Sequence, residues 1–133
     1  MNNTNDSKET QLAATCLLIS VAEADEIFDN NEKNVIIDIL TDFFSISIDK
    51  AEILMKEAHI KLQDSIDIYD FGQKLNLVFD KSDKLDFIYC IFEVAFSDNN
   101  LSYLENHVIN KIANILNVHR TELLEYKAKF NKK

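Results

Sequence analysis

The stretch Leu18-Ile-Ser-Val-Ala-Glu-Ala-Asp25 returns 73 residues later as Ile91-Phe-Glu-Val-Ala-Phe-Ser-Asp98. Both copies are apolar segments that end at an aspartate, and they stay aligned without a gap as far as Glu32 and Glu105. A chance match of two apolar segments would not also preserve the acidic positions that follow them. The chain therefore contains an internal repeat, which organises the rest of the sequence.

The segment that follows each acidic turn has an apolar face at helical spacing. Positions i, i+1, i+4, i+5 and i+8 are apolar in both copies, and this set lies on one face of an α-helix. The aligned pairs are Val35 with Val108, Ile36 with Ile109, Ile39 with Ile112, Leu40 with Ala113 and Phe43 with Leu116. Each repeat is therefore predicted to contain an apolar helix, a short acidic loop, an amphipathic helix and a further helix.

Helical patterns of this kind cover most of the chain. Together with Ser47 as a plausible N-cap, they predict about seven helices. The predicted ranges are 10–27, 30–44, 48–61, 65–79, 83–97, 103–116 and 120–130.

The helices predicted at 10–27 and 83–97 are apolar nearly all round, which is typical of helices buried on most sides. We expect these two helices to pack on each other at the centre, with the other helices around them. Residues 80–83 are the expected hinge between the two halves. The predicted fold is all-α, with two pseudo-twofold-related halves in one domain at 10–131, preceded by a disordered segment at 1–9.

The composition excludes several classes of protein. The chain of 133 residues has no proline and one glycine, Gly72, whereas β-sandwiches and barrels need turn residues about every ten positions. A single glycine also excludes a glycine-rich phosphate-binding loop. The net charge of −9 argues against a nucleic-acid partner, because that affinity comes from lysine and arginine at the phosphates.

The sequence indicates neither export nor membrane insertion. The start, Met1-Asn-Asn-Thr-Asn-Asp-Ser-Lys8, is polar and lacks the apolar core of a signal peptide. The longest apolar run, at 12–22, is shorter than the roughly 18 residues of a membrane span. Cys16 and Cys90 each lie in an apolar helical segment, where reduced thiols of cytosolic proteins are found. We therefore expect a cytoplasmic protein.

Both repeats place polar residues at the same positions around the loop. These residues are Asp25, Asp29 and Glu32 in the first copy and Asp98, Ser102 and Glu105 in the second. Ser102 and Glu105 have the spacing of a capping box, in which each side chain accepts from the other residue's amide. Asp29 and Glu32 can do the same at the start of the amphipathic helix of the first repeat, predicted at 30–44. Capping alone therefore explains four of the six positions.

Capping does not explain Asp25 and Asp98, because a negative charge at the C-terminal end of a helix opposes the helix dipole. A hard cation held between the paired loops would explain both aspartates, since carboxylates suit Ca²⁺, Mg²⁺ and Mn²⁺. The loop is no EF-hand, because Tyr103 and Ile109 occupy the positions of the required glycine and bidentate glutamate. The candidate metal ligands are Asp25, Asp29, Glu32, Asp98 and Glu105.

Two alternatives to metal binding remain at this point: capping alone, or an acidic surface that docks a protein partner. Two triplets of aspartates step by three along the chain. Such runs are mostly solvated surface residues or first-turn acids that suit the helix dipole, and an acidic docking surface for a basic partner is the alternative. These triplets are Asp64, Asp67 and Asp70, and Asp80, Asp83 and Asp86.

No catalytic constellation accompanies these acids. His59, His107 and His119 share no helix face with a cysteine or with one another at ligand spacing, so no zinc site is predicted. The chain contains no Gly-x-Ser-x-Gly motif, and its one glycine could not build an oxyanion turn. We therefore expect a protein that is not an enzyme.

Each repeat has an apolar helix that ends at an aspartate, an acidic loop and a glutamate, at 18–32 and 91–105, and we call these two segments the acidic corners. The acidic corners and two further stretches resemble the family of the tellurite-resistance protein TerB. The further stretches are Asp64-Ser-Ile-Asp-Ile-Tyr-Asp-Phe71 and Ala113-Asn-Ile-Leu-Asn-Val-His-Arg-Thr-Glu-Leu123. The resemblance extends from about Leu12 to Leu124. It implies an all-helical domain with pseudo-twofold symmetry, a cytoplasmic role linked to tellurite and other chemical stress, and metal binding through the paired acidic motifs.

This chain departs from the family pattern at three positions. Glu26 and Asn99 stand where the family favours glycine, and Ser102 stands where the family often has a second acid. The leading hypothesis is a non-catalytic TerB-like domain that binds or senses a divalent cation. The alternative is a metal-free interaction module with an acidic docking surface, whose partner is an unidentified protein such as another stress-response or membrane-associated protein.

Overall fold

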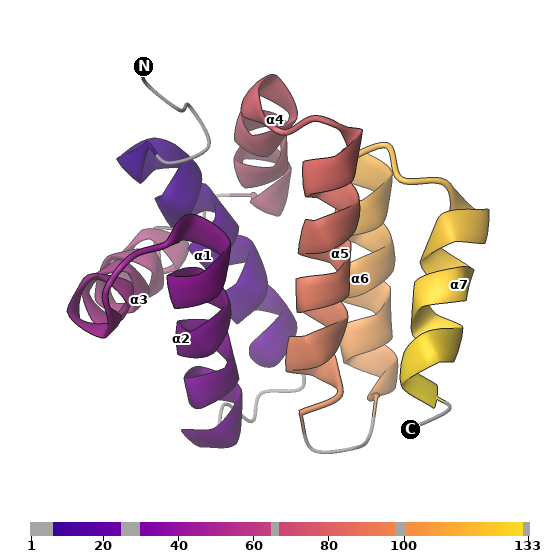
Figure 1. Ribbon diagram of the computed structural model, residues 1–133, viewed down its shortest axis with the longest axis horizontal. Coiled ribbons are helices and arrows are strands. Elements are labelled where there is room, and N and C mark those ends of the chain that lie inside the picture. Colours follow the sequence, from indigo (N-terminus) through magenta and orange to yellow (C-terminus); the bar gives the residue numbers. More distant parts are fainter. Residues whose placement is uncertain (1–6, 25–29, 65–66, 98–100, 132–133) are drawn as a thin grey trace.

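The computed structural model describes residues 7–24, 30–64, 67–97 and 101–131, and for residues 130 and 131 it describes the backbone alone. Seven helices make up most of these residues, and the described ranges contain no strand, so the predicted all-α class is confirmed (Figure 1). The helices are α1 (Lys8–Ala22), α2 (Asn30–Phe44), α3 (Ile48–Leu62), α4 (Ile68–Val78), α5 (Lys81–Ala95), α6 (Tyr103–Ile115) and α7 (Arg120–Asn131).

The helix boundaries follow from side-chain caps that sequence patterning did not locate. Ser7 Oγ accepts from the backbone amide of Thr10 at 3.2 Å, so α1 begins at Lys8, within the segment predicted to be disordered. It ends at Ala22, five residues before the predicted boundary. Ser47 caps α3 as predicted, because its hydroxyl accepts from the amide of Lys50 at 3.2 Å.

The expected hinge at 80–83 is instead the first turn of α5. Asp80 Oδ1 accepts from the amide of Asp83 at 2.8 Å, and Asp83 Oδ2 accepts from the amide of Asp80 at 3.1 Å. This reciprocal capping box starts the helix two residues earlier than predicted, because patterning records apolar residues and not caps. Asp67 similarly caps α4, with its carboxylate 3.0 Å from the amide of Tyr69. Several aspartates of the two triplets thus serve as caps or first-turn acids.

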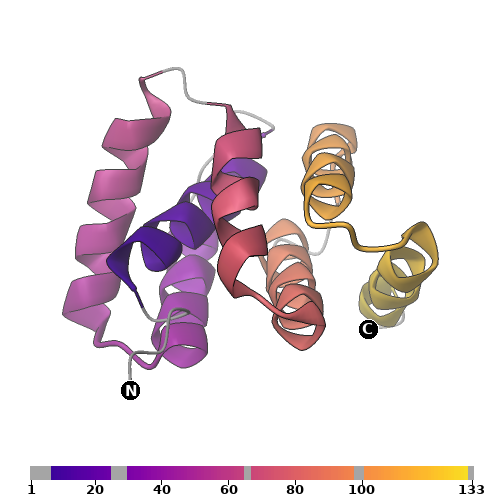
Figure 2. The same ribbon diagram turned by 90° about the horizontal axis from the view of Figure 1, so that it is seen from above.

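Helices α1 and α5 pack on each other at the centre, as predicted. Helix α1 contacts every helix from α2 to α6, and α5 contacts α2, α6 and α7 in addition to α1. Their side chains supply most of the fully buried core, including Leu17, Leu18, Phe87 and Phe92. The remaining helices surround this pair (Figures 1 and 2).

The inner four helices have the predicted pseudo-twofold arrangement. Helix α1 contacts α6 just as its repeat equivalent α5 contacts α2. Aligned residues also match in burial: Ile36 and Ile109 are both buried, as are Ile39 and Ile112.

The repeat offset changes by one residue at the end of α2. Ser45 and Asn117, with φ of 55° and 61°, both have left-handed backbone. Ser45 directly follows α2, whereas Leu116 separates Asn117 from the end of α6. Ser45 and Asn117 are 72 residues apart, whereas residues inside the two helices align at 73. Helix α2 ends at Phe44, two residues beyond the position that aligns with the end of α6, and its left-handed residue comes one position later than the aligned one.

The outer helices depart from the repeat. Helix α3 buries Ala51, Leu54, Met55 and Ala58 against the rest of the protein, whereas among the described side chains of α7 Leu123 alone is buried. None of the described helices has the length and apolar character that crossing a bilayer requires.

Candidate functional site

The two acidic corners are built alike up to the point where the described residues stop. The amide of Glu23 donates to the carbonyl of Ile19 at 2.8 Å, and the amide of Phe96 donates to the carbonyl of Phe92 at 2.9 Å. In both corners the next amide donates three residues back, at 3.2 Å. The ends of α1 and α5 therefore enter their loops with the same backbone geometry, as the sequence repeat predicts.

The first turn of the following helix holds a buried glutamate in each repeat. Glu32 is 5% exposed and Glu105 is 2% exposed. Ser102 Oγ accepts from the Glu105 amide at 3.0 Å, while Glu105 Oε1 accepts from the Ser102 amide at 3.1 Å. The predicted capping box of the second repeat is thus confirmed. Burial of a carboxylate is costly unless hydrogen bonds or a cation compensate it, so two buried glutamates at equivalent places are the outstanding feature of these corners.

Three of the five candidate ligands, Asp25, Asp29 and Asp98, lie outside the described residues. The structure places the other two, Glu32 and Glu105, in the first turns of α2 and α6. Both helices begin on the lower side of the molecule in Figure 1. Within the described ranges, no group of three or more histidine, cysteine, aspartate or glutamate side chains has a metal-binding arrangement. The five-residue metal site therefore stays a prediction.

The architecture and the two corners agree with a comparison against protein families. The family model described as "Tellurite resistance protein TerB" matches residues 11–128. The chain belongs to the TerB family. The TerB match spans the helical region from α1 into α7, which confirms the resemblance inferred from the repeat. Comparisons with curated proteins and with solved structures find no match.

A groove of about 360 Å³ on this TerB domain was not predicted from the sequence. It lies between α2 and α5, and its α2 wall consists of Val35, Asp38, Ile39, Asp42 and Phe43. Cys90 and Glu93 of α5 complete the lining. Asp38 and Asp42 are four residues apart, so both lie on the helix face that carries the apolar residues of the groove. That spacing is a sequence signal, but it does not reveal which helix lies opposite.

The two cysteines of the TerB domain are free, as expected. Burial raises the pKa of the Cys16 thiol to about 11. The pKa of Cys90 is raised to about 12, first by burial and then by the carboxylates of Glu93, Asp86 and Asp42. Both thiols are therefore protonated at neutral pH, and neither has the low pKa of a nucleophilic cysteine.

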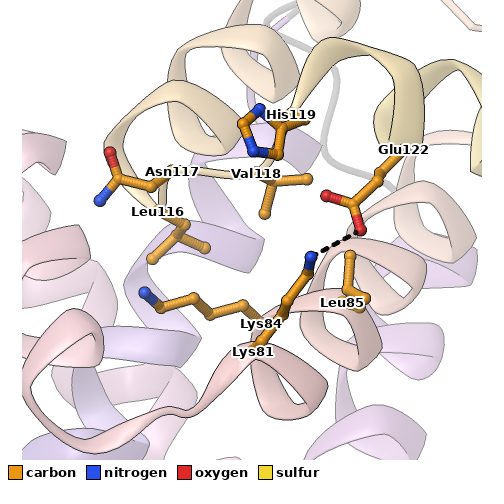
Figure 3. A pocket seen from close by; sticks show the side chains of 8 residues that line it. All are labelled: Lys81, Lys84, Leu85, Leu116, Asn117, Val118, His119 and Glu122. Carbon is orange, nitrogen blue, oxygen red and sulfur yellow. Dashed lines mark ion pairs between the residues drawn. The ribbon is translucent and has the colours of Figure 1, made fainter.

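A second hollow, of about 230 Å³, lies where α5 begins beside the α6–α7 turn (Figure 3). Lys81 Nζ lies 3.5 Å from Glu122 Oε2, so this ammonium group has a carboxylate partner. Lys84 points in a different direction, below Leu116 (Figure 3). Because the two ammonium groups do not converge, the hollow lacks the arrangement that would hold one anion.

Proposed function

We propose that this TerB domain is a non-catalytic module that binds a divalent cation at its paired acidic corners and thereby senses chemical stress in the cytoplasm. The observation that carries the proposal is the burial of Glu32 and Glu105 at equivalent places in the two repeats. The stress role rests on the family, whose description refers to tellurite resistance. The loop residues Asp25, Asp29 and Asp98 would supply the remaining ligands.

The donor chemistry of these residues fits a hard cation. Carboxylate oxygens are preferred by Ca²⁺, Mg²⁺ and Mn²⁺. A carboxylate has about four acceptor positions, so the capping hydrogen bond of Glu105 is compatible with coordination by the same group. The two glutamates and their neighbouring loops supply oxygen donors and no thiolate or imidazole, which disfavours zinc and copper.

Calorimetric titration with CaCl₂, MgCl₂ and MnCl₂ tests the proposal. We expect the wild-type chain to bind at least one of these ions and to melt at a higher temperature in its presence. Glu32→Gln and Glu105→Gln should lose most of this response, because glutamine removes the charge. Glutamine can still accept the capping hydrogen bond, so the metal-free melting temperature should change little.

Glu52→Gln is the matched control, since Glu52 is an exposed acid on α3. It should leave the metal response unchanged. The proposal is wrong if wild type shows neither heat nor a change in melting temperature at millimolar metal, or if all three variants respond alike. The alternative of an interaction module has separate support, because the acidic groove between α2 and α5 offers a surface for a partner.

A further inference from the structure

Helix α4 covers the surface formed by α1 and α6 (Figure 2). It buries Phe71 and Leu75 there. Gly72 permits the close approach, because a Cβ atom at this position would overlap Cγ2 of Ile115 on α6. Asn76 Nδ2 also donates to the carbonyl oxygen of Ile115 at 2.8 Å. This side of the molecule is therefore a groove that an amphipathic helix fills.

An ion pair fixes the beginning of α4 on the same surface. Lys111 Nζ on α6 lies 3.7 Å from Oδ1 of Asp67, which caps α4. The basic residue of the groove thus meets the acidic end of the helix that occupies it.

The repeat maps this covered surface onto the open groove between α5 and α2. Helices α1 and α6 are the equivalents of α5 and α2, and the two pairs make equivalent contacts. Ile112 on α6 aligns with Ile39 in the open groove, and Leu116 aligns with Phe43. None of the described helices lies over α2 and α5 as α4 lies over α6 and α1. The open groove therefore has the backbone framework of a surface that holds a helix in the same molecule.

The open groove differs from the covered one mainly in charge. Lys111 aligns with Asp38, and Ile115 aligns with Asp42. On the central helices, Ser20 aligns with Glu93. The residues that line the open groove include no lysine or arginine. An occupant of this groove must consequently be basic where α4 is acidic.

We propose that the groove between α2 and α5 docks a basic amphipathic helix of a partner protein, in the way that α4 lies on α6 and α1. The partner's apolar stripe would contact Val35, Ile39 and Phe43, while its lysine or arginine residues would face Asp38, Asp42 and Glu93. The influence of Asp42 and Glu93 on the thiol of Cys90 supports this arrangement, because it places their negative charges around the groove floor. The docking proposal does not depend on metal binding at the corners.

A labelled synthetic peptide tests the docking site directly. The peptide would be about 18 residues long, helical in water, with leucine at i, i+3, i+4 and i+7 and lysine elsewhere. We expect it to bind the full chain. We expect the Asp38→Asn/Asp42→Asn/Glu93→Gln variant to bind the peptide with an affinity at least about tenfold lower. Fluorescence anisotropy measures the affinity, and shifts in the methyl signals of Val35 and Ile39 report the location.

A second triple variant, Glu52→Gln/Asp64→Asn/Asp70→Asn, is the matched control. It changes the net charge by the same amount at exposed positions outside the groove, and it should retain nearly the wild-type affinity. A peptide with the same leucine stripe but glutamate for lysine should not bind.

Three outcomes would overturn the docking proposal. The first is an absence of binding to the wild-type chain. The second is an equal loss in both triple variants, which would mean unspecific attraction to an acidic protein. The third is self-association in sedimentation experiments that the groove variant abolishes, since the occupant would then be a second copy of the chain. Circular dichroism verifies that both variants are folded. Metal titration of the same variants should give the wild-type result, which shows that loss of peptide binding is independent of metal binding at the corners.

Discussion

The first repeat is more completely covered than the second. Helix α3 packs along α1 with Ala51 and Ala58 fully buried, and α4 lies on α1 from another side. In the second repeat, α5 contacts α7, whose described side chains include the single buried residue Leu123. The repeat thus fixes the positions of the inner four helices, whereas the outer helices determine which surfaces stay accessible.

The largest difference in stability loss is expected between alanine substitutions at the aligned positions Leu17 and Cys90. Leu17 on α1 is fully buried, whereas Cys90 on α5 is partly exposed in the groove. Leu17→Ala should lower the free energy of unfolding by about 2–5 kcal/mol, as for other buried leucines. Cys90→Ala should cost less than about 1 kcal/mol, because it removes one sulfur atom at a partly exposed position. Urea denaturation measures both values, and equal losses would contradict the comparison.

The packing of α4 predicts a smaller effect at Gly72. Alanine in place of glycine gains about 1 kcal/mol of helix propensity, but the added methyl overlaps Ile115, and such overpacking costs about 1–3 kcal/mol. We therefore expect Gly72→Ala to lower the free energy of unfolding by up to about 2 kcal/mol.

A double-mutant cycle with Ile115→Ala is the control for this prediction. Alanine at 115 removes the methyl group that the new Cβ would overlap. In that background Gly72→Ala should be neutral or stabilising. Additive losses would mean that α4 does not approach α6 closely at this residue.

The capping box at the second corner predicts an effect of about 1 kcal/mol. Ser102→Ala removes the hydroxyl that accepts from the amide of Glu105, and the loss of an N-cap typically lowers the free energy of unfolding by about that amount. Asp29→Ala at the aligned position should have a similar effect if the first corner is capped alike. Thermal denaturation in the presence of a chelator measures both variants without a contribution from metal. A neutral Asp29 variant would show that the corners differ.

The raised thiol pKa values predict that the alkylation rate of Cys90 depends on pH, with almost no effect on stability at pH 7. Because burial and nearby carboxylates raise the pKa of Cys90 to about 12, its alkylation by iodoacetamide should be very slow at pH 8. The rate should rise about tenfold per pH unit up to that pKa. Asp42→Asn/Glu93→Gln should accelerate the reaction at fixed pH, since removal of negative charge lowers the pKa of the thiol. Mass spectrometry after timed alkylation measures the rate.

The raised pKa values of the two thiols also determine how the stability of the fold changes with pH. The folded-state pKa of each thiol is above the ordinary value of 9.0. The resulting stabilisation is present below about pH 9 and is lost as pH rises toward 11 and 12, because the unfolded chain releases these protons first. Cys16→Ala/Cys90→Ala should therefore show a weaker decrease in stability between pH 8 and pH 10.5 than wild type.

Prediction from the sequence succeeded where the signal was periodic or local. The apolar stripes located all seven helices, and apolar residues on nearly every side identified α1 and α5 as the central pair. Helix ends were less accurate at Ser7 and Asp80, because a cap is one hydrogen bond between neighbouring residues and leaves no periodic pattern. The capping box of Ser102 and Glu105 could be predicted because its two residues have a defined spacing.

The sequence by itself determined the helical class, the duplicated inner framework and membership of the TerB family, because each depends on residue types at regular spacings along the chain. Tertiary structure alone decided that α4 covers α1 and α6, and that α2 and α5 leave an acidic groove beside Cys90. Those features depend on which faces of distant helices meet. Contacts such as Gly72 with Ile115 join residues that no spacing in the sequence relates.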